Sequence, residues 1–199
     1  MADRAGADLG DFFEFRVSRS TQPREPLRRA VEARLDGRVF ETFHLDLAVD
    51  EPLVGEPTRM QVTSLLGFAG IPVVEFPCLP LGQHVAEKVH ALVRVRRSGD
   101  NTRVKDLVDL GLIAETCEVD AAEARTALVS VFNGFELSVP EALPKVPVAW
   151  RSQYRRMAQE LGLRADTLDA GVATVSAFVA PLLAGTAAGA WRPDASEWH

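Results

Sequence analysis

The sequence has little cysteine and no long apolar run. Its two cysteines, Cys78 and Cys117, lie far apart and lack the short spacing of metal-binding or redox motifs. No uninterrupted apolar segment is long enough to cross a bilayer, and residues 1–11 lack the apolar core of a signal peptide. The sequence therefore predicts a cytoplasmic protein with reduced cysteines and no membrane contact.

The sequence also lacks an excess of basic residues. It has 22 Lys and Arg against 28 Asp and Glu, a net charge of −6 at pH 7, so the protein as a whole does not attract nucleic acid. Contact with RNA would need a local basic patch, and the arginines between positions 94 and 103 are the candidates. The 47% of hydrophobic residues in 199 is typical of a globular protein with one large or two small domains.

Residues 1–80 are predicted to be rich in β-strand. Apolar and polar residues alternate over 12–17, which indicates a strand. Two further strands, 29–35 and 38–49, flank Asp36-Gly37, a sequence typical of a two-residue hairpin turn. We expect these three strands to form the first part of the fold.

Asp46 lies on the second strand of this hairpin, between Leu45 and Leu47. Because side chains alternate along a strand, Asp46 faces away from the two leucines. A polar residue on a half-exposed strand is the first interpretation, and a role in a site is the alternative. Beyond the hairpin, residues 60–67 predict a short helix and residues 71–76 a short strand.

Residues 81–115 predict two helices joined by a polar loop. On the first helix Lys88 falls inside the apolar arc beside Leu92, whereas His90 and Arg94 fall on the polar side. A lysine in that position packs its aliphatic stem on the core and extends its ammonium to solvent. The alternative is a cation held at the rim of a cleft to bind an anion such as a phosphate.

The second helix is predicted to begin near residues 101–102, either of which can cap it. Asp106 and Asp109 are one turn apart and share a flank with Arg103. A solvated acidic edge with weak local ion pairs is the ordinary interpretation. The alternative is that these acids combine with Lys88 in a functional site.

The rest of the chain predicts helices separated by a proline-rich segment, followed by a tail with two tryptophans. Trp191 and Trp198 either dock on the core or mark a contact surface. The predicted helices are 120–133, capped by Asp120 and ended by Gly134; 150–161, closed by Gly162; and 166–184, capped by Asp166.

The run AEKVHALVRVRRSGDNTRVKDLVDL, residues 86–110, resembles the C-terminal signature of the AbiEii/AbiGii-type toxin nucleotidyltransferases. In that family a helix of the form EK-x-x-A precedes R-x-KD-x-x-DL, and the flanking segments of this chain follow in the same order. The resemblance implies an α+β fold, with a partial polymerase-beta-like nucleotidyltransferase sheet over 1–80 and a helical domain over 81–199. It also implies transfer of a nucleotide from an NTP, with Mg²⁺, to an RNA acceptor such as tRNA. A cognate antitoxin is the implied protein partner.

The resemblance assigns nucleotide binding to three basic residues. Lys88 corresponds to the residue that contacts the triphosphate, and Arg94 and Arg103 match basic positions of the same motifs. In such enzymes the lysine neutralises charge on the triphosphate, and the protein acts through positioning and electrostatics.

The resemblance also assigns catalytic acids. Asp106 is the acid of the last motif, Asp109 is its substitute, and Asp46 matches the hydrophobic-Asp-hydrophobic pattern of a metal-binding carboxylate. The family's first motif, a glycine-serine turn followed by strand acids that bind the metal, has no match; residues 6–10 and 98–100 are the nearest segments. The chain thus resembles a truncated member, in which we expect no activity from these residues alone. A non-catalytic relative that binds nucleotide, RNA or antitoxin is one alternative, and a purely structural protein is another.

Overall fold

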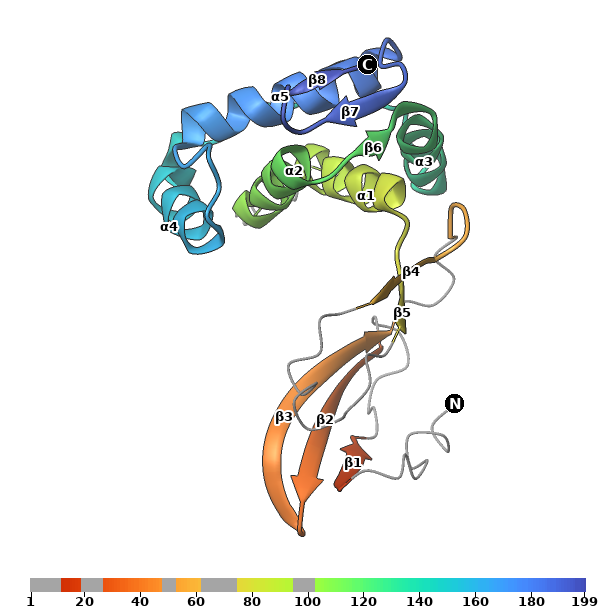
Figure 1. The fold of residues 1–199 in the computed structure, drawn as a ribbon, viewed down its shortest axis with the longest axis vertical. Coiled ribbons are helices and arrows are strands. Elements are labelled where there is room, and N and C mark those ends of the chain that lie inside the picture. Colours follow the sequence, from red (N-terminus) through yellow and green to blue (C-terminus); the bar gives the residue numbers. More distant parts are fainter. Residues whose placement is uncertain (1–11, 19–26, 48–52, 62–74, 95–102) are drawn as a thin grey trace. The chain divides into compact units, whose positions relative to one another are not determined.

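The computed structural model describes residues 12–18, 27–47, 53–61, 75–94 and 103–199. These residues form an α+β fold of small antiparallel sheets and five α-helices (Figure 1). The fold class expected from the sequence is confirmed. The chain divides into two compact units, Met1–Pro52 and Leu53–His199.

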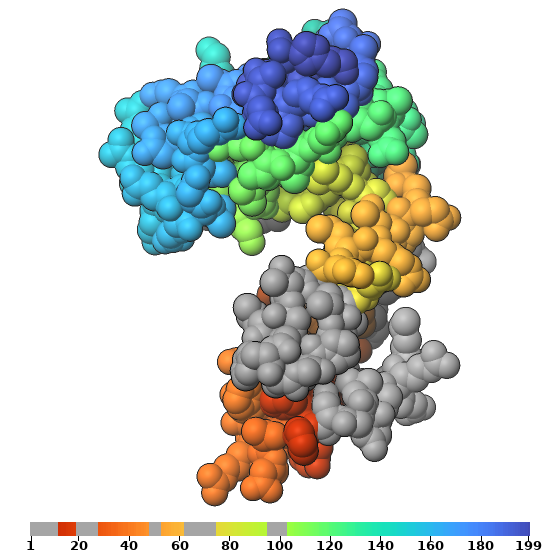
Figure 2. Space-filling model, viewed as in Figure 1, coloured from red at the N-terminus to blue at the C-terminus, as the bar shows by residue number. Residues whose placement is uncertain are grey.

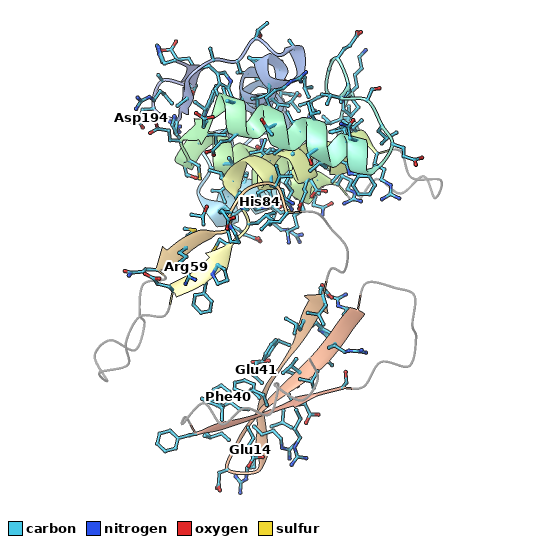
Figure 3. All side chains as sticks on the ribbon, turned by 90° about the vertical axis from the view of Figure 1, so that its right-hand side faces the viewer. Glu14, Phe40, Glu41, Arg59, His84 and Asp194 are labelled. Carbon is cyan, nitrogen blue, oxygen red and sulfur yellow. The ribbon has the colours of Figure 1, made fainter. Side chains whose placement is uncertain are left out.

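The first unit, which we call the sheet unit, contains a three-stranded antiparallel sheet in the order β1-β2-β3. Asp36 and Gly37 both have positive φ, 48° and 70°, as the predicted two-residue hairpin turn requires. Phe40, Glu41 and Glu14 project from this sheet (Figure 3). The strands are β1 (Phe13–Val17), β2 (Leu27–Leu35) and β3 (Arg38–Leu47).

The second unit begins with a short ribbon of β4 (Thr58–Gln61) and β5 (Glu75–Cys78). The helix predicted over 60–67 is wrong at its start, because Met60 pairs with Phe76 across the ribbon. A four-residue segment has too little periodicity to distinguish helix from strand, and the pairing decided between them. The rest of that predicted helix, and most of the strand predicted over 71–76, lie outside the described residues.

Five helices form most of the rest of the second unit, which we call the helical unit. It also contains a small sheet in the order β6-β7-β8. None of the described helices is long and apolar enough to cross a membrane. The helices are α1 (Leu81–Val93), α2 (Val104–Thr116), α3 (Ala121–Gly134), α4 (Arg151–Leu161) and α5 (Leu168–Ala184), and a 3-10 helix at Val148–Trp150 leads into α4. The strands are β6 (Val119–Asp120), β7 (Ala190–Arg192) and β8 (Glu197–Trp198).

The helix caps agree with the sequence in part. Asp120 accepts a hydrogen bond from the backbone N–H of Glu123 at 2.8 Å, which confirms the predicted cap of α3. The cap predicted at Asp166 is wrong, because the hydroxyl of Thr167 accepts the hydrogen bond from Ala170 N–H. Both residue types cap helices well, so their order in the sequence does not decide between them.

Helix α1 lies between α2 and α3 and packs against both, while α2 also packs against α4 and α5 (Figure 1). The approach of α1 to α3 is close at Gly82, where an added Cβ would lie 3.1 Å from the Ala124 backbone. Tight helix contacts of this kind hold the α1 side chains in fixed positions toward α2 and α3.

The C-terminal tail docks on the helices, which answers the question that the sequence left open. The indole of Trp191 is fully buried and donates a 2.7 Å hydrogen bond to the carbonyl of Ala114. Trp198 donates to the carbonyl of Phe178 at 3.0 Å. Figure 2 shows this tail, in dark blue, lying over the helical unit.

Candidate functional site

The clearest polar cluster of the helical unit joins α1 to α2. The Lys88 ammonium donates to Asp109 Oδ2 at 2.5 Å and to Asp106 Oδ1 at 3.2 Å. The second oxygen of Asp106 accepts from Arg103 Nη1 at 3.2 Å. We call these four residues the Lys88 cluster, a network of two cations and two carboxylates.

The cluster is largely shielded from water. The side chain of Lys88 is 21% exposed, and those of Asp106 and Asp109 are 11% and 22% exposed. The solvated acidic edge that the sequence allowed is therefore wrong. The two charges of a shielded ion pair attract each other more strongly than those of a surface pair, and removal of one partner leaves the other charge poorly compensated.

Burial and the two carboxylates act on the Lys88 ammonium in opposite directions. Burial alone lowers the pKa of Lys88, because desolvation disfavours the charged form. The hydrogen bond and charge of Asp109, followed by those of Asp106, outweigh it, and the pKa of Lys88 is raised above its usual value. The lysine is thus held as a cation in a partly dry setting.

The local sequence explains this placement. Val85, Val89 and Leu92 are buried and fix α1 to the core. Lys88 lies three residues after Val85 and four before Leu92, so it lies at the edge of the same face. The sequence predicts Lys88 inside the apolar arc, whereas it lies at the edge of the buried face with a side chain that is 21% exposed. The polar position predicted for His90 is wrong, since that residue is only 6% exposed.

Arg94 does not join the Lys88 cluster. It follows the last turn of α1, where its backbone N–H donates to the carbonyl of His90 at 3.0 Å. Its guanidinium carbon lies 6.0 Å from the centre of the Phe135 ring. Its assignment as a nucleotide-binding residue stays a prediction.

Asp46 belongs to the first unit, on β3. It accepts from Arg28 Nε at 3.2 Å, across the β2–β3 register, and its side chain is 64% exposed. This geometry is that of an ordinary surface pair between strands. Its assignment as a catalytic and metal-binding carboxylate stays a prediction.

The described residues do not fit the expected magnesium ion. Within those ranges no three His, Cys, Asp or Glu side chains come together as a metal-binding group. In the Lys88 cluster the two carboxylates already face Lys88 and Arg103, whose charges oppose a further cation. The Lys88 cluster therefore does not suit a divalent cation.

Sequence reasoning missed a ring cluster on the other side of α1. His90 stacks on Phe135 and meets Phe132 edge to face, and both phenylalanines come from the end of α3. The spacing of the two phenylalanines, one turn apart, shows that they share a side of α3. It does not show that they meet α1.

The comparison with family models identifies the class of protein. The model described as "Nucleotidyl transferase AbiEii toxin, Type IV TA system" matches residues 1–178. Since this match covers most of the chain, the protein belongs to the AbiEii family of nucleotidyltransferase toxins of toxin–antitoxin systems. The resemblance based on the two motifs of residues 86–110 is confirmed.

Among solved structures, the chain is similar to MenT4, the nucleotidyltransferase toxin Rv2826c from Mycobacterium tuberculosis H37Rv. The TM-score is 0.49 at 20% sequence identity, and the similarity covers 93% of this chain and 72% of that chain. No curated protein sequence matches the chain.

Proposed function

We propose that the chain serves nucleotidyl transfer from an NTP to an RNA acceptor such as tRNA, and that the Lys88 cluster binds the triphosphate. Family membership supports the class of reaction. The observation that supports the site is a partly buried lysine kept charged by Asp109 and Asp106. A compact cation of this kind suits the dispersed charge of a polyphosphate.

The proposed reaction joins an acceptor hydroxyl to the α-phosphorus of the NTP and breaks the bond to pyrophosphate, while the proton of the hydroxyl passes to solvent water. Such a reaction depends on alignment and on neutralisation of charge more than on covalent help from the protein. Lys88 and Arg103 supply positive charge, Asp109 orients Lys88, and Asp106 links the two cations.

The carboxylates also set a cost for binding. In the free protein Lys88 is already paired, so a polyphosphate must compete with Asp106 and Asp109 for the ammonium. Binding is then selective for ligands of high negative charge, because a singly charged ligand gains less than the pairs it disturbs. An NTP satisfies this condition.

A non-catalytic relative that binds nucleotide, RNA or a cognate antitoxin is the second candidate. It is favoured by one observation, namely that the described residues gather no metal-binding group. An antitoxin as the protein partner is proposed from the family description alone.

The experiment compares the variant Lys88→Ala with the control variant Lys105→Ala. Lys105 is an exposed residue of α2 that lies outside the cluster. Calorimetric titration with inorganic tripolyphosphate and with NTPs should show roughly tenfold or greater weakening for Lys88→Ala, from loss of a charge-assisted contact. Lys105→Ala should bind nearly as the unmodified protein does. Equal binding by a folded Lys88→Ala variant would contradict the proposed site.

A second measurement separates the two candidate functions. The purified protein is incubated with labelled NTP, Mg²⁺ and tRNA, and the label in the RNA is counted. Incorporation that Lys88→Ala abolishes supports the transferase. Binding of tripolyphosphate without incorporation supports the non-catalytic relative.

A further inference from the structure

The end of α3 carries a phenylalanine ring that lies flat against α1. The centres of the His90 and Phe135 rings are 4.0 Å apart and their planes differ by 13°, whereas Phe132 meets His90 edge to face at 5.4 Å. Phe132 and His90 are buried, but Phe135 is 50% exposed. One aromatic residue of this stack is therefore available to a ligand.

Backbone hydrogen bonds fix Phe135 in place. Leu137 N–H donates to the carbonyl of Phe132 at 2.9 Å, and Glu136 N–H donates to that of Asn133 at 2.9 Å. This is the Schellman arrangement, in which the residue after the cap adopts positive φ. Glu136 has φ of 56°, a conformation that glycine adopts more readily, so the predicted stop at Gly134 is completed two residues later. These bonds fix the backbone at Phe135, and the stack on His90 positions its ring.

A cation and an unpaired ring nitrogen accompany the stack. The Arg94 guanidinium carbon lies 6.0 Å from the centre of the Phe135 ring. Within the described part of the chain, the buried Nε2 of His90 has no hydrogen-bond partner. Burial, followed by the charges of Arg94 and Arg103, lowers the pKa of His90, which keeps the ring neutral. A neutral imidazole can stack on a phenyl ring without the cost of burying a charge.

The stack and the Lys88 cluster share helix α1. His90 follows Lys88 by two residues and so lies on the opposite side of the helix. The charge of Arg103, a member of the cluster, contributes to the lowered pKa of His90. A single half-exposed phenylalanine needs no explanation by itself. A rigid one, backed by a buried ring and placed beside an arginine, combines the features of a base-stacking platform.

We propose that Phe135, backed by His90 and flanked by Arg94, stacks a nucleobase. The base comes either from an NTP or from an unpaired nucleotide of the acceptor RNA. Every nucleobase has a π face, so stacking on phenylalanine and arginine tolerates all four bases. This proposal rests on the proposed function of the Lys88 cluster.

The test titrates the full chain with three probes: inorganic tripolyphosphate, which has no base; the four NTPs; and a single-stranded RNA oligonucleotide without a 5′-triphosphate. Phe135→Ala should bind tripolyphosphate normally. It should bind the NTPs or the RNA roughly 5- to 100-fold more weakly, the effect of losing one stacked base. Weakening confined to NTPs assigns the base to the nucleotide, and weakening confined to the oligonucleotide assigns it to the acceptor.

Two further variants separate stacking from folding. Phe135→Leu keeps an apolar side chain without a ring and should weaken base binding as Phe135→Ala does, whereas Phe135→Trp should retain it. Val129→Ala, at a partly exposed apolar position on α3, is the matched control and should leave all three titrations unchanged.

The inference would be overturned if Phe135→Leu bound both NTPs and RNA as tightly as the unmodified protein does. It would also be overturned if Phe135→Ala weakened the binding of tripolyphosphate and of NTPs equally. A third such result is an unmodified protein that binds tripolyphosphate and NTPs with equal affinity and does not bind RNA. The proposed phosphate site fails by a different result. That result is normal tripolyphosphate binding by Lys88→Ala.

Discussion

The two units of the molecule bury their large apolar side chains to different extents. The helical unit fully buries Trp191, Tyr154 and Phe178. Among the described residues of the sheet unit, only Val31 and Ala33 are buried hydrophobics, and Phe40 is 65% exposed. The contrast shows that the helices form a complete core by themselves, whereas the three described strands cover little of each other's apolar surface.

The ion pairs show the same contrast. Arg28 and Asp46 pair across two strands with both side chains about two-thirds exposed to water. Arg103 and Asp106 pair at the same 3.2 Å distance, but mostly shielded, and Asp106 also holds Lys88. Distance alone therefore does not rank these contacts. Burial decides which of them affects stability or ligand binding.

The largest expected effect concerns the aromatic residues. Trp191→Ala should lower the free energy of unfolding of the helical unit by about 3–5 kcal/mol, because it leaves a large cavity and an unpaired carbonyl at Ala114. Phe40→Ala should cost the sheet unit roughly 1 kcal/mol or less, since the ring is already exposed. Hydrogen exchange of α2 and β3 peptides measures the two units separately. Equal losses of stability in the two units would contradict this difference in burial.

The next effect is a dependence on pH in the helical unit. Burial, followed by the charges of Glu115 and Asp166, raises the pKa of Tyr154 to about 12, and its hydroxyl donates to the Ala165 carbonyl. Between pH 10 and 12 the unfolded chain loses this proton while the folded protein keeps it, so stability should fall as pH rises. The expected loss is about 2–3 kcal/mol. Urea denaturation across this range measures it.

Tyr154→Phe provides the control for this dependence. It should lose less stability than the unmodified protein between pH 10 and 12, because no phenol titrates. Lys88 and other groups titrate in both proteins, so the difference between the two curves isolates Tyr154. Parallel curves would show that burial does not hold the phenol protonated.

The smallest expected effects on stability are those of substitutions at Asp106 in the helical unit and at Asp46 in the sheet unit. Asp106→Asn should lower the free energy of unfolding by about 1–2 kcal/mol, because Lys88 and Arg103 keep less compensation in a shielded site. Asp46→Asn should change it by less than about 0.5 kcal/mol. Urea denaturation followed by circular dichroism measures both variants. A larger effect at Asp46 would reverse the order given by burial.

Much of the local structure could be predicted from the sequence. The hairpin turn at Asp36-Gly37, the cap at Asp120 and the helix end at Gly162 follow from short-range preferences of the backbone. Errors arose where two neighbours both cap helices well, as Asp166 and Thr167 do, or where a segment is short, as at Met60. At Met60 the pairing with Phe76 made the choice.

The candidate site divides in the same way. The sequence by itself determined that Lys88 lies beside Leu92 on its helix and that Asp106 and Asp109 share a flank, because helical periodicity fixes both. Only the tertiary structure decided that Asp109 contacts Lys88 more closely than Asp106 does, and that His90 is buried against Phe135. Those contacts depend on how α1 packs between α2 and α3. Periodicity along a single helix does not encode the packing between helices.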